Sequence, residues 1–109
     1  MRVDAVPQEA FQIPILAALI EMDGKGKVKE VLKKVKRKMG GRLGEADYKQ
    51  LDTGGIRWQN RAMWERLRMV KEGFLRDDSP RGVWEISKKG RDFYHSKRPK
   101  ELVLKDFQK

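Results

Sequence analysis

The sequence predicts a single small domain of the α+β class that is mostly helical, and three observations support this prediction. A chain of 109 residues with 39% hydrophobic content is long enough to bury one modest core. Apolar residues recur at helical spacing up to Phe74. After Phe74 the period changes from 3.6 to 2, which predicts a short hairpin before a last helix. We place this domain at residues 13–96, between a flexible arm (1–12) and a basic tail (97–109).

The first helix is predicted to begin at Ile13 and to end before the pair Asp23-Gly24. Pro14 suits the first helical turn, where its missing N–H would have no intrahelical acceptor. Apolar residues then recur at helical spacing, which predicts a helix that is mostly core; they are Ile15, Leu16, Leu19 and Ile20.

The second helix is predicted from Val28 to Met39, and Gly40-Gly41 ends it. Apolar residues at i, i+3, i+4, i+7 and i+11 form one face, and lysine and arginine fill the rest. Such a basic face is often only solvated. It is also suited to a phosphate backbone, which requires charge and little geometry. We therefore take Lys33, Lys36 and Arg37 as candidate contacts to DNA phosphates.

A third helix is predicted to start between Arg57 and Asn60 and to run to Glu72, with Gly73 as its left-handed stop. Before it, residues 40–55 lie between glycine pairs and hold one helical turn, Glu45 to Leu51. The predicted apolar stripe of the third helix consists of Met63, Leu67 and Val70 and continues to Phe74. Among the tryptophans we assign Trp64 and Trp84 to the core and leave Trp58 open.

The last third of the chain predicts a hairpin and a closing helix. Two extended runs, "FLRDD" and "RGVWEIS", are separated by Ser79-Pro80, and Trp84 and Ile86 share one face. Ser87 is a good N-cap for a short helix, "KKGRDFYHS". The tail from Lys97 fits a helix, a strand or a dimer contact equally well. Three helices, a hairpin and a closing helix follow one another as in a winged helix-turn-helix domain.

Composition limits the function. The formal net charge of +10, from 26 Lys+Arg against 16 Asp+Glu, favours a polyanionic partner, first of all nucleic acid. The longest apolar block, Ile13 to Ile20, is too short to span a membrane, and residues 1–14 do not resemble a signal peptide, so we predict a cytoplasmic protein with no membrane partner. With no cysteine and one histidine, His95, we expect no zinc site, no thiol nucleophile and no cofactor.

The segment from Asn60 to Phe93 resembles the N-terminal winged helix domain of Mrr-type restriction endonucleases. The resemblance rests on an Asn-Arg pair, a tryptophan three residues after the arginine, a helix ending in Gly, and an Arg-Gly-x-aromatic pattern before the last helix. In this sequence those positions are Asn60, Arg61, Trp64, Gly73, Phe74, Leu75, Arg81, Gly82, Trp84, Ile86, Ser87 and Gly90. The first two helices also resemble the family, so that the match spans about residues 13 to 94. Two departures are Glu65, where the family has alanine, and the lack of the nuclease domain that follows in full-length members.

The predicted function is binding of double-stranded DNA without catalysis, as the target-recognition module of a Mrr-like restriction system or as a stand-alone relative. The third helix would enter the major groove. Besides the residues of the second helix, the candidate DNA contacts are Arg57, Gln59, Asn60, Arg61, Arg68 and Arg81. A homodimer is possible, and no small-molecule substrate or metal is expected.

Three alternatives stay open for these residues. Asn60 also fits an N-cap, and Arg61 fits a salt bridge inside the domain. Arg81 also fits a surface pair with Asp77 or Asp78. For the whole chain the alternatives are a protein-interaction module or transcriptional regulator and, further off, a metal-dependent nuclease.

Overall fold

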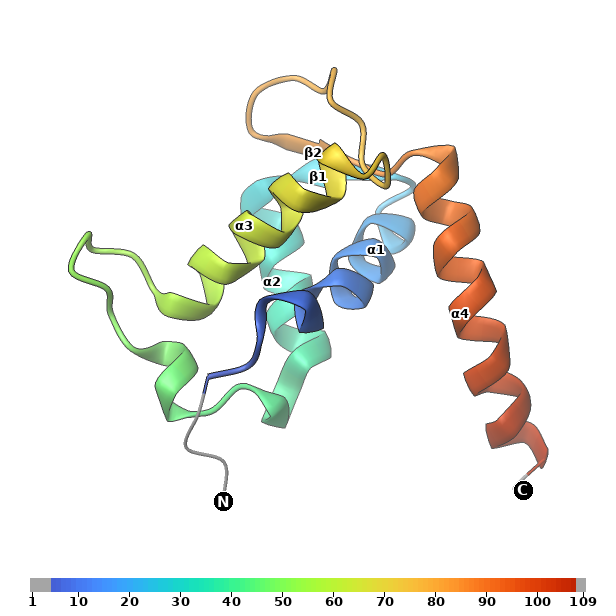
Figure 1. The fold of residues 1–109 in the computed structure, drawn as a ribbon, viewed down its shortest axis with the longest axis horizontal. Helices are drawn as coiled ribbons and strands as arrows, with labels where there is room; N and C mark the ends of the chain where they lie inside the picture. The colour runs from blue at the N-terminus through green and yellow to red at the C-terminus, as the bar shows by residue number, and fades with distance from the viewer. Residues whose placement is uncertain (1–4, 108–109) are drawn as a thin grey trace.

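The computed structural model describes residues 5–107, with side chains described as far as Lys97. It is a mostly helical, winged-helix-like α+β fold with a two-stranded antiparallel sheet (Figure 1). The elements in chain order are η1 (Gln8–Phe11), α1 (Gln12–Glu21), β1 (Lys25–Lys27), α2 (Val28–Met39), η2 (Gly40–Arg42), η3 (Glu45–Tyr48), α3 (Arg57–Lys71), β2 (Val83–Glu85) and α4 (Lys88–Phe107).

The first two long helices follow the predicted boundaries closely. α1 ends where Asp23 and Gly24 adopt positive φ angles of 61° and 104°, and the Gly24 N–H donates to the Leu19 carbonyl at 2.7 Å. α2 spans the predicted residues and buries Val31, Val35 and Met39. In the loop that follows, the predicted helical turn is the short 3-10 helix η3.

The prediction of a flexible arm is wrong for residues 5–12, which pack against the body of the domain. Val6 and Phe11 are buried, and the Phe11 ring stacks on Trp58 with its centroid 6.3 Å away. The Val6 N–H donates to the fully buried Asp47 carboxylate at 2.7 Å. Because a buried amide needs an acceptor, this bond ties the N-terminal segment to η3. Residues 1–4 of the predicted arm lie outside the described residues.

The predicted apolar stripe of α3 is wrong at its first two positions. Met63 and Leu67 are exposed, and Trp64, predicted as core, is 56% exposed. The buried face instead carries Trp58, Ala62, Glu65 and Met69, so that the helix is rotated relative to the prediction. Trp84 is buried as predicted.

The sheet pairs β2 with a strand that the sequence pattern did not reveal. β1 runs antiparallel to β2 with Gly26 opposite Trp84. The predicted first strand of the hairpin contributes one bridge, Leu75 to Ile86. Trp84 and Ile86 share the buried face, as predicted. The loop between Leu75 and Val83 forms the wing, at the top of Figure 1.

The closing helix α4 is longer than predicted. Its N-cap is Ser87, as expected, because the Ser87 hydroxyl accepts from the Gly90 N–H at 3.0 Å. A Cβ on Gly90 would lie 2.1 Å from the Phe74 carbonyl oxygen, so only glycine permits this approach. The backbone of the predicted tail is helical through Phe107, along one side of the molecule in Figure 1. Residues 108–109 lie outside the described residues.

Candidate nucleic-acid interface

Helix α3 carries most of the predicted site residues, and its two flanks have different neighbours. One flank faces α2 and contains Gln59 and Arg66; we call it the groove flank. The other, which we call the arm flank, faces the N-terminal segment and contains Arg57, Arg61 and Arg68. These three share one side because they are spaced at i, i+4 and i+11. Between the flanks an outer face is exposed to solvent.

A groove lies between α2 and the first turn of α3. Its volume is about 350 Å³, and it is lined by Lys29, Leu32, Lys33, Lys36, Trp58 and Gln59. Its three lysines share one side of α2 because they are spaced at i, i+4 and i+7. The structure thus brings together three of the predicted DNA contacts, Lys33, Lys36 and Gln59.

The groove lysines are weakly engaged within the protein. Lys33 Nζ is 3.9 Å from a Glu30 oxygen in an exposed pair, and Lys36 Nζ lies 5.6 Å from the centre of the Tyr48 ring. Lys29 has neither a hydrogen bond nor an ion pair within the described residues. Exposed pairs of this kind are worth less than about 1 kcal/mol, so all three ammonium groups are available to an anion.

The lysines on the opposite side of α2 are paired with α1. Lys34 Nζ is 3.5 Å from one oxygen of Glu21, and Lys38 donates a hydrogen bond to the other. This hydrogen bond from Lys38 holds the pKa of the Glu21 carboxyl below its usual value. α2 therefore carries two sets of lysines: a paired set, bound to Glu21, and an open set, whose ammonium groups are available to an anion. Arg37 points outward between the two sets and is exposed.

On the arm flank, two of the predicted DNA contacts hold the fold together. Arg61 donates to the Val6 carbonyl at 2.8 Å, which favours the internal role that the sequence left open, through a backbone carbonyl rather than a carboxylate. Arg68 donates to Glu65 at 2.9 Å and also to Glu72. The hydrogen bond with Glu65 raises the pKa of Arg68 above its usual value.

Glu65 is fully buried and faces the N-terminal segment, where it also accepts from Gln8 Nε2 at 3.1 Å. The carboxylate that stands where the family has alanine therefore does not lie on the outer face of α3. Its charge is satisfied by Arg68 and Gln8 inside the domain.

Asn60 is exposed on the outer face of α3, one turn inside the helix. Ile56 stands at the N-cap position, and the Asn60 N–H donates to the Ile56 carbonyl at 3.0 Å. The alternative of Asn60 as an N-cap is therefore wrong, and its side-chain amide is directed to solvent. Arg57 begins the helix, with its N–H bonded to the Lys49 carbonyl at 3.0 Å.

The wing carries one paired arginine and one unpaired arginine. Arg76 donates to both oxygens of Asp78 at 2.9 and 2.8 Å, which lowers the pKa of the Asp78 carboxyl. Arg81 is exposed and makes no hydrogen bond or ion pair in the part of the chain that the structure describes. The alternative of an Arg81 pair with Asp77 or Asp78 is therefore wrong.

Arg81 sits in a turn that is attached to α2. The Val83 N–H donates to the Pro80 carbonyl at 3.0 Å, and Gly82 adopts a φ of 79°, as the third residue of a type II turn requires. The Gly82 carbonyl accepts from the first N–H of α2, at Val28, at 3.0 Å. This bond places the turn next to Lys29, at the end of the groove that is nearest the start of α2.

Sequence reasoning missed two cations on this side of the molecule, Lys29 and Arg66. The i, i+4, i+7 spacing of Lys29 with Lys33 and Lys36 is visible in the sequence and could have identified it. Arg66 follows Gln59 by seven residues and lies over Trp84 of β2, with Cζ 5.8 Å from the ring centre. Its Nε is buried with no hydrogen-bond partner, so only packing against the sheet fixes its position.

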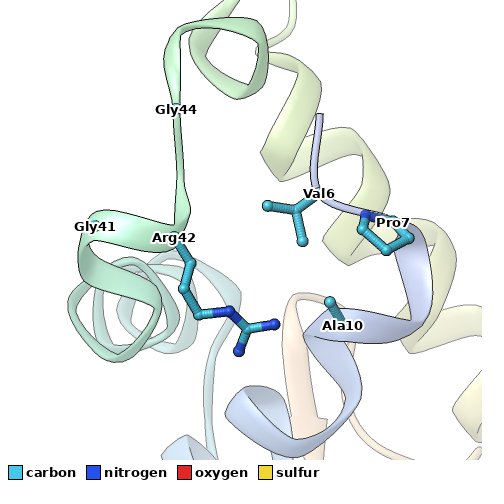
Figure 2. Close-up of a pocket in the computed structure, with 6 residues that line it drawn as sticks. All are labelled: Val6, Pro7, Ala10, Gly41, Arg42 and Gly44. Carbon is cyan, nitrogen blue, oxygen red and sulfur yellow. The ribbon is translucent and has the colours of Figure 1, made fainter. Parts of the chain in front are cut away.

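A second hollow of about 390 Å³ lies between the N-terminal segment and the loop after α2 (Figure 2). Its lining is Val6, Pro7, Ala10, Gly41, Arg42 and Gly44, and the Arg42 side chain reaches toward Ala10. Among the described residues of this lining, Arg42 is the only one with an ionisable side chain, so these residues offer no acid–base pair.

Two kinds of feature are absent from the described part of the chain. No group of three or more His, Cys, Asp or Glu side chains is arranged to hold a metal ion there. Its helices also lack the combination of length and apolar character that crossing a membrane would require.

Comparison with known protein families matches most of the chain. The model of the Mrr N-terminal domain matches residues 9–96, which are most of the chain and include the groove, α3 and the wing. No curated protein and no solved structure matches this chain. Since the match covers far more than half of the residues, the chain belongs to the family of Mrr N-terminal domains, which associates it with Mrr-like restriction systems.

Proposed function

We propose that this domain binds double-stranded DNA, without cleaving it, as the target-recognition module of a Mrr-like restriction system or as a stand-alone relative. The observation that carries the proposal is the α2–α3 groove, where three lysines of α2 with weak or no internal partners lie beside the first turn of α3. Duplex DNA presents a dense row of phosphates, and such a row suits cations spaced along a helix.

The geometry supports a specific mode of binding. Lys29, Lys33 and Lys36 would follow one phosphate strand along α2. The first turn of α3 has no side-chain cap, so its N–H groups after Arg57 and the positive end of its dipole would add to the attraction for phosphate. The outer face of α3 would then enter the major groove, and Arg81 of the wing would reach the neighbouring groove.

The distribution of charge favours this function over a protein-interaction module whose lysines serve only solubility. Solubility alone requires no division between open and paired lysines. On α2, however, the two lysines facing α1 are both paired with Glu21, whereas those facing α3 have weak partners or none among the described residues. This concentration of open charge beside α3 supports a polyanion as the ligand.

The test compares two double variants of α2 that remove the same charge. Lys33→Ala with Lys36→Ala removes two groove lysines, and Lys34→Ala with Lys38→Ala removes the two that pair with Glu21. Duplex affinity is measured against salt concentration. The slope of log affinity against log salt should fall by about 2 for the groove variant, because each phosphate contact contributes about 0.9. The slope of the control variant should stay close to that of the unmodified protein.

Equal slopes for the two variants would show that only net charge matters and would overturn the groove as the binding site. No measurable duplex binding by the unmodified protein at low salt would overturn the proposed function itself.

A further inference from the structure

The outer face of α3 is apolar, which is unusual for the exposed side of a helix in so basic a domain. Met63, Trp64 and Leu67 are 45%, 56% and 37% exposed, and Asn60 lies one turn before them. Their spacing of three, four and seven residues from Asn60 places all four on one side of the helix. Large exposed apolar side chains gathered in this way mark a binding surface.

The charge around this face identifies the kind of partner. Lys71 lies on the same side at the C-terminal end of α3, Arg57 starts the helix, and the groove lysines lie beyond Gln59. A second copy would bring one domain of net charge +10 against another, with the same cations opposed across the contact. Duplex DNA instead offers negative charge on both sides of a groove whose floor carries apolar groups.

The chemistry of the base edges narrows the choice of base pair. In the major groove, thymine presents a C5-methyl group, which apolar side chains contact, and adenine presents N7 and N6 to a bidentate asparagine amide. An A·T pair therefore matches both kinds of side chain on this face. A C·G pair offers neither the methyl group nor the adenine pattern.

We infer that the outer face of α3 reads A·T base pairs in the major groove, with Asn60 on adenine and with Met63, Trp64 and Leu67 on thymine methyl groups. This inference rests on the proposed function. From Asn60 to Leu67 the helix rises about 10 Å, since each residue adds about 1.5 Å. Base pairs are stacked about 3.4 Å apart, so the face covers about three of them.

The test uses three duplexes of equal length that differ only in base edges: alternating A·T, the same duplex with uracil for thymine, and alternating G·C. Uracil removes the methyl group and keeps every hydrogen-bonding group. We expect the unmodified domain to bind the uracil duplex about fourfold more weakly for each methyl contact, and the G·C duplex at least about tenfold more weakly.

Trp64→Ala should remove most of the difference between thymine and uracil while leaving the salt dependence unchanged. Trp64 is exposed, so this change does not disturb the core. Trp64→Phe keeps an apolar ring and should restore the difference. Asn60→Ala should reduce the preference for A·T over G·C by about tenfold, as expected for the loss of one bidentate pair.

The outcomes separate this inference from the proposed function. Tight, salt-dependent binding that is equal for all three duplexes would overturn the reading of A·T pairs and leave DNA binding standing. A concentration-dependent dimer that Trp64→Ala abolishes, without any change in base preference, would assign the face to a second copy and overturn the inference. Absence of binding to every duplex at low salt would remove both.

Discussion

The two flanks of α3 carry similar residues but differ in what surrounds them. On the arm flank, Arg61 and Arg68 reach the Val6 carbonyl and the buried Glu65. On the groove flank, Gln59 borders three lysines, and none of these makes more than a weak exposed pair or a ring contact. The difference shows that a basic residue stays available to a ligand where its internal partners are absent or exposed, and is engaged where a buried carboxylate or a backbone carbonyl accepts from it.

Breaking the arm flank should affect stability and not binding. Glu65→Ala leaves Gln8 without its acceptor and Arg68 without its strongest partner, and it opens a cavity at a fully buried position. We expect the free energy of unfolding to fall by about 2 to 3 kcal/mol in urea titrations, at the low end for a buried pair because Arg68 is 38% exposed.

Glu72→Ala is the matched control for Glu65→Ala. It removes the other carboxylate that pairs with Arg68, at a position where that carboxylate is 43% exposed. The expected loss is less than about 1 kcal/mol. Similar losses for the two variants would show that burial on the arm flank has no special importance.

Replacing one arginine of the arm flank and one of the wing should separate the stabilising role from the DNA-binding role. Arg61→Ala loses the hydrogen bond to Val6 and should cost about 1 kcal/mol of stability, with the salt dependence of duplex binding unchanged. Arg81→Ala should change stability by less than about 0.5 kcal/mol and lower the salt slope by about 1. A fall in the salt slope for Arg61→Ala as well would return Arg61 to the DNA-contacting surface.

The smallest effect is expected within the wing, where Arg76 is paired and Arg81 is not. Hydrogen bonds from Arg76 hold the pKa of Asp78 below its ordinary value of 3.8. A lowered carboxyl pKa stabilises the folded state above the ordinary value, and that contribution is lost as the pH falls through the lower, folded-state pKa. An NMR titration of the Asp78 carboxyl should show the depressed pKa, and Arg76→Ala should return it to the ordinary range. An unchanged Asp78 pKa in that variant would show that the pair does not persist in solution.

Sequence periodicity predicted α2 correctly because every apolar position of that helix faces the core. It failed on α3 because Trp64 is exposed and the neighbouring Glu65 is buried. Neither fact follows from the period of α3 alone. Glu65 is buried because Gln8, far away in the sequence, and Arg68 satisfy its carboxylate. If the buried face of a helix is assigned one residue too early or too late, the predicted orientation is rotated by about 100°. For α3, that orientation decides which arginines face the N-terminal segment.

The strand β1 could not be predicted for a similar reason. Lys25-Gly26-Lys27 is short, polar and without alternation, and it becomes a strand only because Val83–Glu85 supplies the pairing partner. The packing of the N-terminal segment also depends on a tertiary contact, because Val6 donates to Asp47, which lies 41 residues further along the chain. Within the candidate site, the α2 lysines and the exposed wing arginine could be predicted from the sequence. Both depend on a local pattern: the helical spacing of the lysines and the turn residues around Arg81.

The hydrogen bond between the Val28 N–H and the Gly82 carbonyl has a consequence for the kinetics of recognition. It holds the backbone of the wing turn against the first turn of α2, so that the backbone positions of Arg81 and Lys29 change little relative to each other before any ligand arrives. The protein therefore loses little backbone entropy when a ligand contacts both residues. Differences in affinity between such ligands should then lie mostly in their dissociation rates. Amide exchange at Val28 would report the lifetime of this arrangement.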